Sequence, residues 1–599
     1  MIKKVSQSYK HNIGEIIFGP FLKVIEAVFD LMMPLVMKAI IDLSQYGEPN
    51  NIPNPVSSLF ASLIRGINQQ GSTIGDALTG GIFIFVMGLI GYALTMWAQY
   101  LAAKVSVNVG TEVRSSLYSQ ILHLSKKERE QISNARLLTL INSDSYQLQH
   151  GVLLFVRLIV RAPVILFGSL ILSFILDWRV GLAFTAIVPM ILLTNYLVLR
   201  KSSKGYVEIQ NDLDELSNQT SETSEGSRVI RASNNQNNEN ASFGIKTESY
   251  QQKSINVNKV NALINPLIFA ITSIVIVVIV LLLQNDLFGA GNINISSTII
   301  AEMAYLSQIF FVTVQLSQVI IEIVKASVSR KRIDDVLSIS PEITNTKTLV
   351  NEPKDDVPLI KFSHVSFAFN KNEQPFLNDL DFEIRKGETF GIIGGTGSGK
   401  STIINLIERF YDVTAGEILY NGISLKEYDL KSLRNDVGLV NQKSSLFKGT
   451  IKTNYLMSNP QASDEEIYEA LKLAEAYEFV NKYEDNINHE VNEGGLNFSG
   501  GQRQRLCIGR ALVKKPKILI LDDSTSALDL LTDKRIRENV ASFKDMTKII
   551  VSQRVSTIQN ADFILVLEAG KVVGQGKHEA LMKECSIYQE IYQTQIKKE

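Results

Sequence analysis

Residues 391–402 read GIIGGTGSGKST, and this stretch decides the fold of the C-terminal half of the chain. Within it, residues 394–401 match the pattern G-x-x-x-x-G-K-[ST]. An apolar run, ETFGIIG, precedes the pattern, and STIINLIERF, with apolar residues at helical spacing, follows it. Glycines let backbone N–H groups surround a phosphate, and the start of a helix adds the positive end of its dipole. The stretch therefore predicts a phosphate-binding loop between a strand and a helix, in which Lys400 reaches the phosphates and Ser401 binds Mg²⁺.

Two further motifs extend this interpretation. The run KILILDD at residues 517–523 predicts a buried parallel strand that ends at Asp522, which can hold Mg²⁺. An ordinary strand ending in a helix-capping aspartate is the alternative. The run FSGGQRQR at residues 498–505 predicts a second helix start that binds anions. One chain does not need two phosphate sites unless the second acts on a nucleotide held by another chain, so the sequence predicts a dimer.

The N-terminal half is dominated by long apolar runs. A membrane-crossing helix needs ~20 mainly apolar residues to span ~30 Å of hydrocarbon. The clearest run, AITSIVIVVIVLLL at residues 270–283, carries no charge. Six runs predict an all-α bundle of transmembrane helices, with buried helices of a soluble protein as the alternative: residues 16–41, 81–107, 152–176, 180–200, 261–284 and 298–324.

The loops between these runs differ in charge. Residues 43–80 contain a single basic residue, Arg65, whereas residues 108–150 and 201–260 contain many. The positive-inside rule then predicts that both termini and the two basic loops are cytoplasmic. The basic loops carry apolar residues at helical spacing and predict helices that continue out of the membrane, with a disordered linker as the alternative. The external segment is expected to hold a short helix near residues 56–67.

Charged and amide side chains recur at helical spacing within two of the predicted spans. Lys23 shares one face of the first span with two acidic residues, and amide and acidic residues share one face of the last span. Charges inside a membrane are costly and usually face the bundle interior or water. We expect a central cavity that favours cationic amphipathic substrates, with polar contacts between helices, or an ion pair to Lys23, as the alternative. The candidate cavity residues are Glu26, Asp30, Gln308, Gln315 and Glu322.

Taken together, these motifs resemble those of the ATP-binding cassette (ABC) exporter family, and the resemblance covers nearly all of the chain. It implies a half-transporter, in which the helical bundle is fused to an α/β P-loop nucleotide-binding domain, with ATP and Mg²⁺ as cofactors. In this family two cassettes pair head to tail, and each ATP lies between one phosphate loop and the partner's signature motif. Short helices in the inner loops, here near residues 135–142 and 222–231, would transmit closure to the membrane helices.

The resemblance also assigns roles to individual residues. Phe369 would stack on adenine, and Gln442 would sense Mg²⁺ and the membrane domain; Phe498 replaces the usual Leu before the signature. The implied nucleotide contacts are Phe369, Gly394, Gly395, Thr396, Gly397, Ser398, Gly399, Lys400, Ser401, Thr402, Ser499, Gly500, Gly501, Gln502 and Asp529, the last from the D-loop at residues 526–529. The implied Mg²⁺ ligands are Ser401, Gln442 and Asp522, and the implied hydrolytic residues are Asp523, Gln553 and Gln442.

Two of these positions depart from the family pattern. Asp523 stands where the family usually has the Glu that positions the attacking water, and Gln553 stands where it usually has a His that contacts the γ-phosphate. A side chain one methylene shorter falls about 1.5 Å short, and a misplacement of about 1 Å can cost on the order of 100-fold in rate. We expect the site on this chain's phosphate loop to bind ATP well and to hydrolyse it poorly.

The combined interpretation is one subunit of a heterodimeric multidrug exporter in a bacterial cell membrane. Its partners would be a related half-transporter, the lipid bilayer and an amphipathic small molecule; the net charge of −1 argues against nucleic acid. The expected domains are a transmembrane domain at 1–330, a linker at 331–357 and a nucleotide-binding domain at 358–599. The alternatives are a homodimer with weak hydrolysis through Asp523, a dedicated lipid, peptide or siderophore exporter, and an ATP-gated regulatory or channel subunit.

Overall fold

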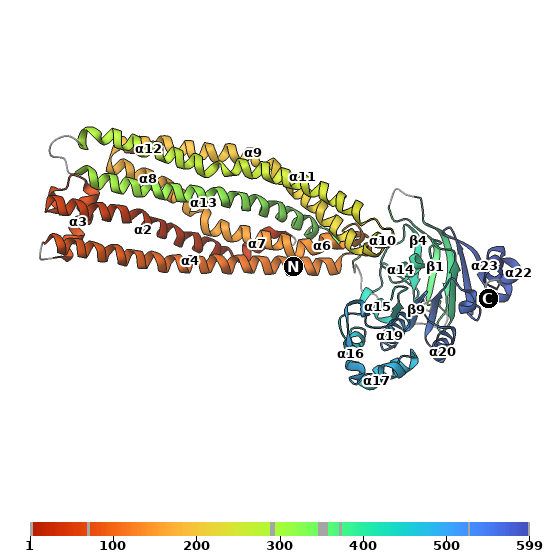
Figure 1. Cartoon of the computed structure of the whole chain (residues 1–599). Coiled ribbons are helices and arrows are strands. Elements are labelled where there is room, and N and C mark those ends of the chain that lie inside the picture. The colour runs from red at the N-terminus through yellow and green to blue at the C-terminus, as the bar shows by residue number, and fades with distance from the viewer. Residues whose placement is uncertain are drawn as a thin grey trace. The chain divides into compact units, whose positions relative to one another are not determined.

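The computed structural model describes residues 4–68, 72–287, 294–344, 357–370, 374–524 and 528–596. The chain forms two compact units, shown in Figure 1. The helical unit comprises Met1–Leu122 and Asn134–Ile339, and the α/β unit comprises His123–Ser133 and Ser340–Glu599.

The helical unit consists of long helices that run side by side (Figure 1). The basic loops are largely helical, as expected, because α4, α9 and α11 run through most of them. The short helix expected near residues 56–67 is confirmed as α3. The helices are α1 Val5–His11, α2 Ile13–Tyr46, α3 Pro55–Ile67, α4 Thr73–His123, α6 Asn134–Thr139, α7 Ser145–Leu154, α8 Arg161–Leu176, α9 Trp178–Glu225, α10 Ser227–Ala232, α11 Gln236–Ala262, α12 Ile264–Leu287 and α13 Asn294–Leu337.

Five helices of the described residues are long and apolar enough to cross a membrane. They contain four of the six predicted spans in full and the span at 261–284 as far as Leu281. The remaining predicted span lies in α2, which has 34 residues and is therefore about 51 Å long at 1.5 Å per residue. Every stretch of 18 residues in α2 carries at least three charged side chains, which is why this helix is not apolar enough to count with the others. A membrane crossing by α2 stays a prediction.

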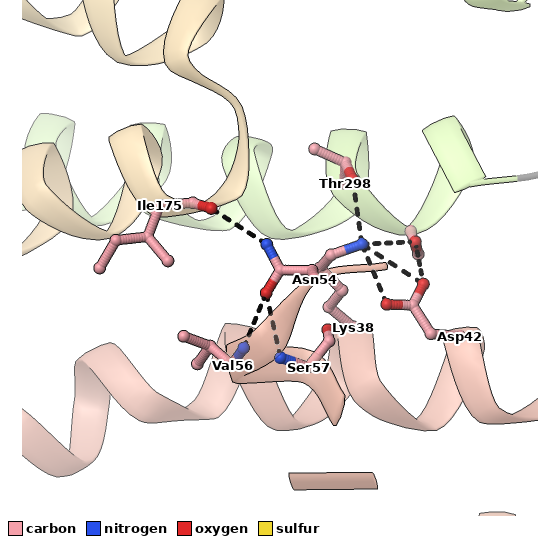
Figure 2. A network of polar contacts seen from close by, with 8 residues as sticks. Lys38, Asp42, Asn54, Val56, Ser57, Ile175 and Thr298 are labelled. Carbon is pink, nitrogen blue, oxygen red and sulfur yellow. Dashed lines mark hydrogen bonds and ion pairs between the residues drawn. The ribbon is translucent and has the colours of Figure 1, made fainter. Parts of the chain in front are cut away.

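Two polar residues determine where neighbouring helices begin. The Asn54 side chain accepts hydrogen bonds from two backbone N–H groups of α3, at 3.0 and 3.1 Å, and Pro55 occupies the first helical position. The same amide donates to the Ile175 carbonyl in α8 at 3.0 Å (Figure 2). Between α8 and α9, the extended residue Asp177 accepts from the Arg179 N–H at 2.8 Å and starts α9.

A buried polar network joins α2 to α13 near the end of the bundle that carries α3 (Figure 2). Lys38 lies 3.1 Å from the carboxylate of Asp42, one turn later on α2. The same ammonium group donates to the hydroxyls of Ser297 and Thr298 on α13, each at 3.0 Å. Because Lys38 and Asp42 are both buried, each charge depends on the other for compensation.

The α/β unit is built around three sheets (Figure 1). Its strands are β1 Ile360–Phe367, β2 Leu377–Ile384, β3 Thr389–Gly394, β4 Ala415–Tyr420, β5 Ile423–Ser424, β6 Val437–Val440, β7 Gly449–Thr450, β8 Glu490–Val491, β9 Ile518–Asp522, β10 Thr547–Val551, β11 Phe563–Glu568 and β12 Lys571–Gly576. Its helices are α5 Lys126–Glu130, α14 Lys400–Ile407, α15 Leu430–Asp436, α16 Ile451–Leu456, α17 Asp464–Leu473, α18 Tyr477–Val480, α19 Gly500–Leu512, α20 Leu530–Ala541, α21 Val555–Ile558, α22 His578–Glu584 and α23 Ser586–Ile596.

The largest sheet has the strand order β12-β11-β3-β10-β9-β6. All its pairings are parallel except that of β12 with β11. Val551 of β10 pairs with Ile392 of β3 on one side and with Asp522 of β9 on the other. The carboxyl ends of these three strands therefore meet at one edge of the sheet, where ligands of open α/β folds bind.

Candidate functional site

The predicted phosphate loop lies between β3, which ends at Gly394, and α14, which begins at Lys400. Gly399 has a φ of 105°, and a Cβ at this position would lie 2.4 Å from the Leu377 side chain. A Cβ at Gly394 would lie 2.2 Å from the Leu567 carbonyl oxygen. Only glycine fits these positions. The loop thus turns tightly into a helix N-terminus, as a phosphate-binding backbone requires.

The body of the loop leaves room for a ligand. Cβ atoms added at Gly395 or Gly397 would meet no atom within 4 Å, whereas Ser398 and Thr402 are buried. The Lys400 ammonium group donates to the carbonyls of Gly394 and Gly395, at 2.9 and 2.7 Å. Burial lowers the pKa of Lys400, and the carboxylates at the end of β9 act in the opposite direction. A positive charge thus lies inside the loop, where phosphate oxygens would bind.

Oxygen ligands suited to Mg²⁺ lie next to this loop. The Ser401 hydroxyl lies 3.4 Å from a carboxylate oxygen of Asp522. Burial raises the pKa of Asp522 and the charge of Asp523 adds to this, whereas the Ser401 hydrogen bond and the Lys400 charge lower it. Among the described residues no group of three or more His, Cys, Asp or Glu side chains could hold a metal. The hydroxyl and carboxylate fit Mg²⁺, which is usually held by few protein ligands together with substrate phosphates.

The two positions that depart from the family pattern lie at the ends of adjacent strands. Asp523 follows β9 with a φ of 45°, and its N–H donates to the Val551 carbonyl at 2.9 Å. Its carboxylate accepts a hydrogen bond from the Gln442 side chain at 3.2 Å. Gln553, two residues beyond β10, is exposed. The structure therefore brings Gln442 and Asp523 together beside Asp522.

Gln595 of α23, which sequence reasoning did not single out, holds the segment that carries Gln553. Its side-chain amide donates to the Gln553 carbonyl at 2.7 Å and accepts from the Val555 N–H at 2.8 Å. No motif marks Gln595, because the contact depends on where α23 packs.

The signature residues form the start of α19. Ser499 and Gln502 make a capping box, in which each side chain bonds the other's backbone N–H, at 3.3 and 3.0 Å. Gly500 is exposed, and Gly501 is partly exposed. Phe498 is buried and makes edge contacts with the stacked rings of Tyr483 and His489, so the larger side chain at this position is accommodated in the core.

Two further predicted nucleotide contacts have clear local roles. Phe369 remains 37% exposed beside the rings of Phe367, Phe376 and Tyr411, which leaves one side of an aromatic cluster open. Asp529 caps α20 by accepting from the Thr532 N–H at 2.9 Å, and this hydrogen bond lowers its pKa. Residues 526 and 527 of the D-loop lie outside the described residues.

A short helix that sequence reasoning did not identify, α5, contacts the helix that begins at the phosphate loop. Lys126 donates to the Asn405 side chain in α14 at 3.1 Å, and the Tyr411 hydroxyl donates to Glu130 at 2.9 Å. The inner-loop helices expected near residues 135–142 and 222–231 are present in the helical unit, largely as α6 and α10, and their role in transmitting closure stays a prediction. A signal was present, since the S-x-x-E pattern at residues 125–128 forms a capping box.

The candidate cavity residues of α2 have partners within the chain. Glu26 is 5% exposed and pairs with Lys23, three residues earlier. Asp30 accepts from Arg161 of α8 at 2.7 Å, and Arg161 also lies 3.9 Å from Glu26. The positive charges of Lys23 and Arg161 thus compensate the negative charges of Glu26 and Asp30. Arg161 was missed in the sequence, although an arginine in an apolar run indicates an acidic partner nearby.

The candidate cavity residues of α13 differ in their surroundings. Gln308 donates to the Asp30 carbonyl of α2 at 2.9 Å. Glu322 accepts from Lys325 at 2.8 Å and from Gln147 of α7 at 2.9 Å. Gln315 is exposed. Most of the stripe therefore makes polar contacts between or along helices, which was the alternative interpretation.

The comparisons with known proteins cover both units. Residues 16–310 match the family model of the ABC transporter transmembrane region, and residues 377–526 match that of the ABC transporter. The chain is 32% identical over 602 residues to a Mycoplasma genitalium protein with the provisional name of an ABC transporter ATP-binding protein, covering 97% of this chain and 96% of that one. It is also 32% identical over 566 residues, covering 93% and 96%, to a Staphylococcus aureus protein with the provisional name of a multidrug export ATP-binding/permease protein.

Among solved structures, that of a bacterial Atm1-family ABC exporter with ATP bound matches 98% of each chain with a TM-score of 0.80. Its sequence identity is 21%, so this likeness concerns the fold. Because a 32% identical relative covers nearly the whole chain and both family models match, this chain belongs to the ABC transporter family, as an ATP-driven exporter half-transporter with fused transmembrane and ATP-binding domains.

Proposed function

We propose that this chain is one subunit of a heterodimeric exporter and that its own phosphate loop forms the weaker of two ATP sites. The pair of departures at Asp523 and Gln553, in an otherwise complete site, carries this proposal. Lys400, Ser401 and Asp522 are arranged to bind nucleotide and Mg²⁺. Asp523 and Gln553, which would direct the attacking water, are the residues that differ from the family pattern. The site should therefore still bind ATP but hydrolyse it slowly.

The geometry of Asp523 explains the expected loss of rate. Its backbone is held to β10 through Val551, and its carboxylate is held by Gln442 at 3.2 Å. A Glu at this position would reach about 1.5 Å further. A well-placed general base contributes roughly 10²–10⁴-fold in rate, which corresponds to about 3–5 kcal/mol of barrier. Asp523 cannot recover this distance without breaking contacts that hold it.

The residues of this chain have distinct roles in the proposed cycle. Lys400 binds the phosphates, and Ser401, Asp522 and Gln442 would hold Mg²⁺, which, when bound, neutralises charge on the phosphates. The capped start of α19 presents Ser499 and its glycines to the ATP held by the partner chain. The short inner-loop helices near residues 135–142 and 222–231 would transmit closure of the cassettes to the membrane helices.

The proposed substrates are amphipathic small molecules. The name of the Staphylococcus aureus relative, which refers to multidrug export, supports this class. A preference for cationic substrates stays a prediction, although the ion pairs of Glu26 and Asp30 with Lys23 and Arg161 reduce the negative charge that favours it. The basic loops support an orientation in a bacterial cell membrane with both termini and the α/β unit in the cytoplasm.

ATPase activity in lipid tests the proposal directly. The chain purified alone is compared with the chain copurified with the product of its neighbouring gene. We expect the chain alone to be nearly silent and the pair to be fast. Comparable rates in the two samples would show that Asp523 suffices as a base and that a homodimer is the working form.

A further inference from the structure

A buried carboxyl group in α13, Glu302, has no role in the proposed ATP or substrate sites. Its exposed fraction is 0%, and neither carboxylate oxygen has a hydrogen-bond partner among the described residues. Because a single chain buries it completely, no partner subunit can supply the missing contact. A carboxylate buried without a donor is among the most costly groups in a protein, and such groups are usually neutralised.

Two serine hydroxyls of α8 are likewise buried without a hydrogen-bond partner among the described residues. Ser169 and Ser173 are one turn apart, both have an exposed fraction of 0%, and both hydroxyls lack a hydrogen-bond partner among the described residues. Ser173 lies beside Glu302 without completing a hydrogen bond to it. Three buried polar groups with unused hydrogen-bonding capacity thus lie on two packed helices, α8 and α13.

The two charged groups that act on Glu302, Lys38 and Asp177, are each already paired with another side chain. Lys38 on α2 is bonded to Asp42 and to two α13 hydroxyls (Figure 2). Asp177, at the end of α8, is paired with Arg179 of α9 at 2.8 Å. Residues 264–281 of α12 carry no charge. Among the described residues, the nearby cation Lys38 is therefore paired with another acid, and Glu302 has no counter-ion of its own.

We propose that Glu302, with Ser169 and Ser173, forms a proton-binding site in the transmembrane domain. The proton sits on a carboxylate oxygen of Glu302, which gains an O–H donor for the Ser173 hydroxyl. A metal cation would need more oxygen ligands than one carboxyl and two hydroxyls provide. Since the site has no exposed surface, the O–H bond can break and pass its proton to water only when the helices around it separate. This inference requires only that the chain is a membrane-spanning ABC exporter, and it does not depend on the heterodimer proposal.

Infrared spectroscopy of the full-length exporter in lipid tests the site. A protonated carboxyl has a C=O stretching band that a carboxylate lacks. We expect this band in the wild type, a clear loss of its intensity in Glu302→Gln, and its full retention in the matched control Glu322→Gln, whose carboxyl already has donors. A Glu302→Gln spectrum identical to that of the wild type in this region would mean that Glu302 is a carboxylate, and the proposal would be wrong.

A second variant keeps the test valid if Glu302→Gln does not fold. Ser173→Ala retains the carboxyl but removes the hydroxyl beside it, so the same band should move to higher frequency. A band that does not move would overturn the assignment to this cluster. In heavy water the band should shift slowly without ATP and quickly during ATP turnover; an equally fast shift in both conditions would show that the site is not enclosed.

Discussion

Replacing Asp523 by Glu provides the sharpest test of how this chain's own ATP site works. The substitution adds one methylene, so the carboxylate can reach about 1.5 Å beyond its present position, where Gln442 holds it at 3.2 Å. If a misplacement of about 1 Å costs on the order of 100-fold, Asp523→Glu should raise hydrolysis at this site by roughly 100-fold, or about 2.7 kcal/mol of barrier.

The assay has to isolate this site from the partner's. In the proposed heterodimer, we would measure single-turnover ATP hydrolysis in lipid with the catalytic Glu expected in the partner chain replaced by Gln, so that only the Asp523 site remains active. Asp523→Asn is the matched control and should change the rate by less than about threefold, because a base that does not reach the water contributes little. Should Asp523→Asn abolish hydrolysis while Asp523→Glu leaves it unchanged, Asp523 is already a competent base and the reasoning fails.

Three further changes probe the contacts described above. Gln595→Ala removes two hydrogen bonds from the Gln553 segment, each worth about 1 kcal/mol, and should weaken equilibrium ATP binding roughly tenfold. Gln595→Glu keeps only the acceptor and should weaken ATP binding less. If neither variant changes the affinity for ATP, Gln595 does not position the Gln553 segment for nucleotide binding. Burial raises the pKa of Glu408 from 4.5 to about 7, so between these pH values the folded state keeps a proton that the unfolded state loses. The α/β unit should therefore lose about 3 kcal/mol of stability as pH rises from 4.5 to 7. Thermal unfolding across this range should show the loss in the wild type and not in Glu408→Gln. Lys38→Met leaves buried Asp42 unpaired and should cost about 3–5 kcal/mol, most of which the double variant Lys38→Met/Asp42→Leu should recover in the same unfolding assay.

Several features were readable from the sequence because they depend on local spacing. The phosphate loop could be predicted because its glycines, Lys400 and Ser401 lie in one short segment between a strand and a helix. Asp522 could be placed next to it because the carboxyl ends of parallel strands meet at one edge of a sheet. Five apolar spans were correctly predicted because a helix that crosses a membrane has to be apolar along its whole length.

The partners of the charged and amide residues could not be read in this way. Arg161 and Asp30 are separated by 131 positions, and Gln595 and Gln553 by 42. Periodicity correctly placed Glu26 and Asp30 on one face of a helix, but it does not show which neighbouring helix covers that face. Packing places Arg161 beside these two carboxylates, and their role in lining a cavity stays a prediction.

The sequence by itself therefore determined the ATP-binding machinery and the division into an apolar, helical half and an α/β half, because each rests on residues close together in the chain. Only the tertiary structure decided which buried charges are compensated. It pairs Lys38 with Asp42, and within the part of the chain that it describes it leaves Glu302 enclosed without a hydrogen-bond donor. The physical reason is that the cost of a buried charge depends on the atoms that surround it, and helices distant in sequence supply those atoms.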